Sequence, residues 1–199
     1  MKRDFLVTVC ASGGGGNFEA VAREQGAAGY RVNLLIVDRE CGAIDKARQA
    51  KIPYRLLDRR LPEQDFSRAM DQAIPADTDL IVLAGFFPII GADLCRKWVG
   101  RMINTHPSLL PKHGGRGMYG VRVQEAVLAS GDTMAGCTVH YVDESIDGGE
   151  IILQHSVAVR DRETAWDLGG RIFLEENRLL VRAIELIMSK RGEPDVQVE

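Results

Sequence analysis

The segment NTHPSLLP at residues 104–111 places an amide, an imidazole and a hydroxyl within five residues. An asparagine such as Asn104 can donate to a developing oxyanion, and histidine is the side chain that titrates nearest neutrality, so Asn104 and His106 suit acyl-type transfer. Pro107 biases His106 away from helical geometry. If the backbone before Pro107 is extended, Asn104 and His106 face one cleft and Thr105 faces away. The alternative is a structural histidine beside a rigid proline turn.

Asp147, in an Asp-Gly-Gly turn, is a further candidate for chemistry. A carboxylate close to an imidazole favours the protonated ring and fixes its orientation, which makes the ring a usable electrophile or proton relay. By itself, a turn of this composition is most often only a hairpin turn.

The glycine-rich segment SGGGGN at residues 12–17 could bind an anion. Glycines let backbone amides approach a phosphate, and the N-terminus of a following helix adds a favourable partial charge. The segment is not a Walker loop and does not fit the GxGxxG spacing cleanly. A flexible turn capped by Asn17 is the alternative.

The elements that must position these groups alternate between strands and helices. Apolar, β-branched runs predict strands and helical spacing predicts helices, which indicates an α/β fold with a doubly wound, mostly parallel sheet and a Rossmann-type N-terminal half. The expected strands are 5–10, 32–38, 52–57 and 80–85, and the expected helices are 18–25, 41–51 and 66–74.

The second half of the chain changes character. We expect a C-terminal antiparallel hairpin followed by a long helix that is interrupted near Gly169-Gly170. We assign a single domain to residues 1–190 and a polar tail to residues 191–199. The remaining expectations are a strand at 101–104, an irregular loop at 106–120, a helix at 123–131 ending at Gly131, hairpin strands at 136–143 and 150–159, and the long helix at 164–190.

Composition narrows the class of protein. A hydrophobic content of 45% with 27% charged residues is ordinary for a packed protein, and no run is long enough to span a membrane. A net charge of −3 argues against nucleic-acid binding. The four scattered cysteines suggest neither a zinc site nor a disulfide framework, so we expect no metal. The N-terminal apolar run is too short for a secretory signal, so we expect a cytoplasmic location.

Taken together, these motifs resemble a known family. The order of the glycine loop, LAGF, NTHPSLLP and TVHYVDESIDGGEIILQ is similar to the folate-dependent formyltransferases, specifically the phosphoribosylglycinamide formyltransferases, from about residue 5 to about residue 180. The resemblance implies a formyltransferase-like fold and 10-formyltetrahydrofolate as co-substrate. It also implies formyl transfer to the amine of N1-(5-phospho-D-ribosyl)glycinamide in de novo purine biosynthesis, by a monomer or homodimer acting on small molecules.

The resemblance also implies roles for individual residues. The catalytic places fall on Asn104, His106 and Asp147. The amides of Gly15, Gly16 and Asn17 would hold the substrate phosphate, and Glu176 would contact the glycinamide end. The folate would lie against Phe86, Phe87, Pro88, Ile89, Ile90, Asn104, Val142 and Asp143.

The sequence departs from the family pattern at three positions. Gly16 stands where many members have Ser or Thr, Pro88 replaces a frequent Arg, and Asn177 stands where His is common. The expected folate-contacting arginine has three candidates, which remain open: Arg59, Arg60 and Arg68.

Rival functions share parts of the pattern. A formyltetrahydrofolate deformylase would use the same three polar residues with water replacing the amine, although it usually carries an extra N-terminal domain. Formyltransferases acting on initiator tRNA or nucleotide sugars carry additional C-terminal domains. A noncatalytic folate- or phosphate-binding homologue is the third alternative, because the departures at Gly16, Pro88 and Asn177 remove ligand contacts.

Overall fold

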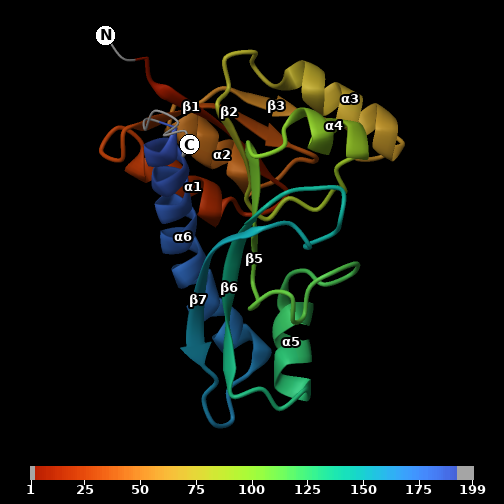
Figure 1. The fold of residues 1–199 in the computed structure, drawn as a ribbon, viewed down its shortest axis with the longest axis vertical. Coiled ribbons are helices and arrows are strands. Elements are labelled where there is room, and N and C mark those ends of the chain that lie inside the picture. Colours follow the sequence, from red (N-terminus) through yellow and green to blue (C-terminus); the bar gives the residue numbers. More distant parts are fainter. Residues whose placement is uncertain (1–2, 192–199) are drawn as a thin grey trace, which may run out of the picture.

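The computed structural model describes residues 3–191 as a seven-stranded sheet with helices on both faces (Figure 1). Strands β1 to β5 run parallel, and β6 is antiparallel to both of its neighbours, β5 and β7, which confirms the expected fold class. In sheet order the strands are β3 (Tyr54–Leu56), β2 (Tyr30–Val37), β1 (Phe5–Ala11), β4 (Leu80–Leu83), β5 (Met102–His106), β6 (Met134–Tyr141) and β7 (Ile151–Ala158). The helices are α1 (Gly16–Glu24), α2 (Gly42–Gln49), α3 (Glu63–Ala73), α4 (Ala92–Lys97), α5 (Val121–Ala129) and α6 (Ala165–Lys190).

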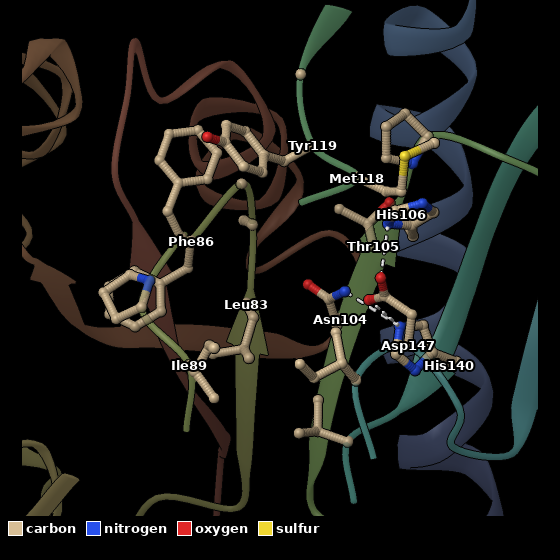
Figure 2. A pocket seen from close by; sticks show the side chains of 18 of the residues that line it. Leu83, Phe86, Ile89, Asn104, Thr105, His106, Met118, Tyr119, His140 and Asp147 are labelled. Atoms are coloured by element: carbon tan, nitrogen blue, oxygen red, sulfur yellow. Dashed lines mark hydrogen bonds and ion pairs between the residues drawn. The ribbon is translucent and has the colours of Figure 1, made fainter. Parts of the chain in front are cut away.

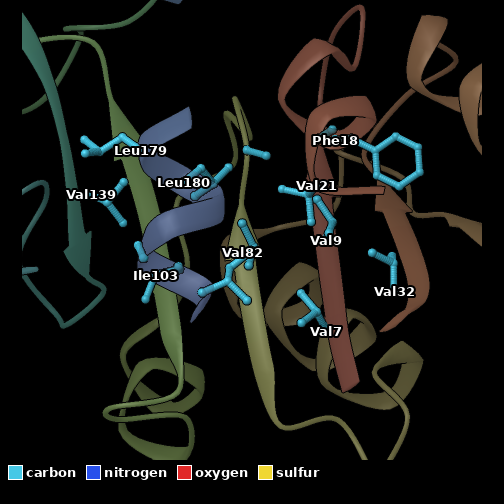
Figure 3. Packing of buried hydrophobic residues seen from close by; sticks show 14 of the residues in the cluster. Val7, Val9, Phe18, Val21, Val32, Val82, Ile103, Val139, Leu179 and Leu180 are labelled. Carbon is cyan, nitrogen blue, oxygen red and sulfur yellow. The ribbon is translucent and has the colours of Figure 1, made fainter. Parts of the chain in front are cut away.

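The larger core lies between the sheet and helices α1, α2 and α6. Val9, Val82 and Ile103 project from neighbouring parallel strands toward Val21 of α1 and Leu180 of α6 (Figure 3). All five side chains are buried, and burying an aliphatic side chain of this size stabilises the fold by about 1.5–3 kcal/mol. This core fixes α6 beside α1 and the end of β5.

A second core covers the opposite face of the sheet. Ile81 and Met102 point to this face, where they meet Phe66 and Met70 of α3 and Leu94 of α4. Adjacent residues of one strand, such as Ile81 and Val82, therefore bury their side chains on opposite faces. Burial on both faces explains why the parallel strands read as continuous apolar runs.

Helix α6 is continuous, so the expected interruption near Gly169-Gly170 is wrong. A capping box formed by Thr164 and Asp167 starts the helix. Leu168 and Ile172 are fully buried on either side of the glycines. Each helical glycine costs about 1 kcal/mol relative to alanine. The burial of these two side chains outweighs that cost, so the helix runs through.

The remaining differences are the end of β5 and one additional helix, α4. Strand β5 extends to His106, which therefore lies in the sheet rather than in the following loop. Helix α4 was not expected from the sequence. Residues 107–120 form no helix or strand, as expected, and Gly131 has the left-handed φ of 71° expected after α5.

Within residues 3–191, no helix is long and apolar enough to cross a membrane. Most of the expected polar tail lies outside the described residues.

The strand order creates a crevice at the carboxyl edge of the sheet. The strand order reverses between β1 and β4, so the loops that follow these two strands lead to opposite sides of the sheet. In open α/β sheets, ligands bind in the crevice at such a switch point. The glycine loop follows β1, residues 84–91 follow β4, and β5 ends at His106 on the same edge.

Candidate active site

One cavity of about 590 Å³ opens at this edge, and apart from the three candidate arginines its lining includes every residue that the sequence suggested for the site. Its walls come from the glycine loop, the loop after β4, the end of β5, the loop before α5, the β6–β7 connection and helix α6. The predicted residues among its lining are Gly15, Gly16, Asn17, Phe86, Phe87, Pro88, Ile89, Ile90, Asn104, His106, Val142, Asp143, Asp147 and Glu176.

His106 lines the cavity at the end of β5, and both of its ring nitrogens face polar groups. Its Nε2 is 2.9 Å from the backbone carbonyl of His113. Since a carbonyl can only accept, Nε2 carries a hydrogen. Nδ1 lies 3.5 Å from Oδ2 of Asp147, which is longer than a direct hydrogen bond (Figure 2). Nδ1 is therefore the ring nitrogen that can exchange a proton with a substrate.

Asn104 is held by His140, a residue that the sequence reasoning missed. Asn104 and His140 are opposite each other in the antiparallel β5–β6 pair, and Asn104 Nδ2 lies 3.1 Å from His140 Nε2 (Figure 2). His140 Nδ1 donates to the carbonyl of Tyr141 at 2.8 Å, so the neutral ring accepts from Asn104 through Nε2. Burial lowers the pKa of His140 and keeps it neutral. The second Nδ2 hydrogen of Asn104 remains for a ligand.

Asp147 lies in the connection between β6 and β7 and is held there by a hydrogen bond. Its backbone has a φ of 56°, in the left-handed region, and its Oδ2 accepts from the N–H of Gly115 at 2.9 Å. Its Oδ1 also lies 3.8 Å from Nε2 of His140. The carboxylate therefore faces both imidazoles, and its anchoring to the loop before α5 joins two segments that are distant in sequence.

The glycine loop forms the end of the cavity at the N-terminus of α1. Gly15 has a φ of 72° and caps the helix without a side-chain hydrogen bond. The first amides of α1 have no intrahelical acceptors and are available to an anion. A Cβ built on Gly16 would lie 2.2 Å from Cζ of Phe173, so the Phe173 ring occupies the space that a Ser or Thr at position 16 would need. The glycine at position 16 and the phenylalanine at position 173 are therefore sterically coupled.

Glu176 lies on α6, one turn after Phe173, and reaches the cavity from the opposite face of the sheet. Thr105 points away from Asn104 and His106, as expected, and its Oγ1 donates to Glu176 Oε1 at 2.9 Å. Burial raises the pKa of Glu176 to about 7, whereas the hydrogen bond from Thr105 acts in the lowering direction. A carboxyl group with this pKa changes protonation near neutral pH.

The other end of the cavity is apolar. Leu83, residues 86–90 and Val142 form one wall. The ring of Tyr119 lies 5.4 Å from that of Phe87 across the opening. This wall can take a flat aromatic ligand.

None of the three candidate arginines lines the cavity. Arg59 Nη1 lies 3.9 Å from buried Asp38, and Arg60 and Arg68 pair with acidic neighbours in their own segments. Among the described residues, Arg116 is the arginine in the cavity lining. Within this same part of the chain, no group of three or more His, Cys, Asp or Glu side chains could hold a metal ion.

Sequence comparisons place the chain among known proteins. The sequence model of a family described as formyl transferase matches residues 6–184. A phosphoribosylglycinamide formyltransferase of Vigna unguiculata, named as chloroplastic, is 36% identical over 93% of this chain and 61% of its own length. The trifunctional purine biosynthetic protein adenosine-3 of Bos taurus is 36% identical over 92% of this chain. The chain spans 18% of that relative, so it matches only part of both proteins.

Solved structures of similar length share the fold. Glycinamide ribonucleotide transformylase 1 from Symbiobacterium toebii superimposes with a TM-score of 0.86 at 32% identity, covering 94% of this chain and 89% of the other. Phosphoribosylglycinamide formyltransferase from Bacillus halodurans gives a TM-score of 0.85 at 30% identity, covering 98% of this chain and 100% of the other.

Proposed function

Because the chain belongs to the formyl transferase family, we propose that it transfers the formyl group of 10-formyltetrahydrofolate to the amine of N1-(5-phospho-D-ribosyl)glycinamide. This reaction belongs to de novo purine biosynthesis. The observation that carries the proposal is the convergence of Asn104, His106 and Asp147 in one cavity with an apolar wall and a glycine loop at its two ends. The family match over residues 6–184 supports a single formyltransferase domain over residues 1–190.

The two ends of the cavity suit the two substrates. The pterin of the folate packs against residues 86–90 and Val142, next to Asp143. The phosphate of the ribonucleotide binds the amides of Gly15, Gly16 and Asn17 at the N-terminus of α1. The amine then lies between these ends, near Glu176 and Asn104. The folate is a co-substrate, the proposal assigns no metal, and we place the enzyme in the cytoplasm.

The chemistry requires stabilisation of one negative charge. The amine nitrogen attacks the formyl carbon, and the electron pair of the C=O bond moves to oxygen to give a tetrahedral oxyanion. The free Nδ2 hydrogen of Asn104 and the Nδ1 hydrogen of protonated His106 donate to that oxygen. Asp147, 3.5 Å from Nδ1, stabilises the charged ring.

Collapse of the intermediate completes the transfer. The bond between the formyl carbon and N10 of the folate breaks as the C=O bond re-forms. The attacking nitrogen loses a proton and N10 gains one. His106 can carry this proton through Nδ1, directly or through a water molecule. The net reaction exchanges one N–C(formyl) bond for another, so no oxidant or metal is consumed.

A substrate-dependence assay tests the proposal. Purified protein is incubated with 10-formyltetrahydrofolate, with and without the ribonucleotide amine, and formation of the deformylated folate is followed optically. The proposal predicts turnover only when the amine is present. Turnover without the amine would instead indicate a deformylase, and folate binding without turnover would indicate a noncatalytic homologue. Either result would overturn the proposal.

A further inference from the structure

His113 lies outside the cavity lining, but its backbone carbonyl contacts the central histidine. This carbonyl accepts the Nε2 hydrogen of His106 at 2.9 Å. Among the described contacts of the ring nitrogens it is the one at hydrogen-bond distance, since Asp147 lies 3.5 Å from Nδ1, and it favours a hydrogen on Nε2 in the neutral form. A shift of the carbonyl would release Nε2 and allow the ring to rotate or to change tautomer.

The backbone of His113 needs external support. Its φ of 56° lies in the left-handed region, which costs a residue other than glycine roughly 1–2 kcal/mol. Residues 107–120 supply no helix or strand to hold this conformation. Hydrogen bonds anchor the backbone on either side, at Lys112 and Gly115, and the contact of the His113 side chain is the further support at His113 itself.

That side chain is tied to Asp132, which follows helix α5. His113 Nε2 lies 2.7 Å from Asp132 Oδ2, and their side chains are only 14% and 17% exposed. Lys112 Nζ contacts the other carboxylate oxygen but is 63% exposed. His113 and then Lys112 hold the pKa of Asp132 well below its usual value. The backbone N–H of Asp132 donates to the carbonyl of Val127, which holds Asp132 at the end of α5.

We propose that His113 and Asp132 are positioning residues that fix the tautomer and orientation of His106. The chain of contacts runs from the end of α5 through Asp132, the His113 ring and the His113 carbonyl to Nε2 of His106. It leaves Nδ1 facing Asp147 and the substrates. The proposal rests on the proposed formyl transfer for its kinetic consequence, but its structural consequence at His106 can be measured without any substrate.

The kinetic test compares Asp132→Ala and His113→Ala with Lys112→Ala as the matched control. Lys112→Ala removes the other cation on Asp132 and leaves the His113 contact in place. Displacing a catalytic group by about 1 Å can cost about 100-fold in rate. We expect kcat to fall about 10- to 100-fold in the first two variants and to change less than about twofold in Lys112→Ala. KM should stay unchanged throughout, because neither His113 nor Asp132 lines the cavity.

The structural test reads the His106 ring directly by ¹⁵N NMR of histidine-labelled protein. The intact protein should show His106 with the neutral ring hydrogen on Nε2, and Asp132→Ala should show a mixture of both tautomers. His113→Gln, whose amide can still donate to Asp132, should restore the single tautomer and most of kcat. The shape of the kcat/KM profile against pH should change in Asp132→Ala and His113→Ala, whereas His113→Gln should keep the profile of the intact protein.

The outcomes separate this inference from the proposed function. A wild-type tautomer in Asp132→Ala, or kinetics that match those of Lys112→Ala, would overturn the inference. Equal losses in all three variants would also do so, because they would reflect general damage to the loop. If the intact protein lacks transferase activity but the tautomer responds as described, the proposed function fails and the positioning role stands.

Discussion

Glu176 supplies a prediction whose magnitude follows from its burial. Glu176 is 7% exposed, and burial raises the pKa of its carboxyl group from an ordinary value of 4.5 to about 7 in the folded chain. Between these two values the unfolded chain loses a proton that the folded chain keeps. The free energy of unfolding therefore falls as pH rises through this window, by about 1.4 kcal/mol per unit and about 3 kcal/mol in total.

The perturbation that tests this is Glu176→Gln. A glutamine can still accept from Thr105 Oγ1 but cannot ionise. At about pH 5 the wild-type carboxyl is protonated in the fold, so the two proteins should have similar stabilities. At about pH 8 the variant should be more stable than wild type by about 2.5 kcal/mol relative to that baseline, because about two pH units of the window lie above pH 5.

The assay is urea unfolding of both proteins at the two pH values, with extrapolation to water. Glu185→Gln is the matched control, because it removes an exposed carboxylate from the same helix. The control should show no comparable change between the two pH values. If the stability difference between wild type and Glu176→Gln is the same at both, the carboxyl is not desolvated as described and the reasoning is refuted.

Three further predictions concern the cavity. His106→Ala and Asp147→Ala should each lower kcat about 100- to 1000-fold without lowering the melting temperature by more than a few degrees, and near-wild-type turnover in either would contradict the assigned roles. Gly16→Ser should raise KM for the ribonucleotide, because its Cβ would collide with the Phe173 ring, and adding Phe173→Ala should reverse the effect; a KM unaffected by the second change would disprove the coupling. His140 should titrate below its ordinary value of 6.5 in a pH series followed by NMR, because burial disfavours its charged form, and a midpoint at or above 6.5 would contradict the neutral ring that accepts from Asn104.

The sequence predicted the parallel strands because their apolar runs are a direct result of burial on both faces. It also predicted that Asn104 and Thr105 point to opposite faces of the sheet, since side chains alternate along any extended segment. The local sequence could not predict that α6 is continuous. The burial of Leu168 and Ile172 offsets the low helix propensity of the glycines, and this burial exists only when α6 packs against the sheet and α5.

The site was predictable in its parts but not in its assembly. His106 and Asp147 stand out by residue type, yet only the folded chain, or the family resemblance, brings them into one cavity. His140 could have been found from the antiparallel register, which places it opposite Asn104. No local signal marks Phe173 or the His113–Asp132 pair, because their significance depends on contacts with distant segments.

In the proposed reaction, His106 promotes movement of a formyl group from folate to an amine. Its most direct test is a single-turnover reaction of 10-formyltetrahydrofolate carrying a ¹³C-labelled formyl group with the ribonucleotide amine, followed by NMR for wild type and His106→Ala. We predict that the wild-type protein moves the label onto the amine nitrogen and that His106→Ala does so about 100- to 1000-fold more slowly. Label released as formate, or transferred at the same rate by His106→Ala, would contradict the account.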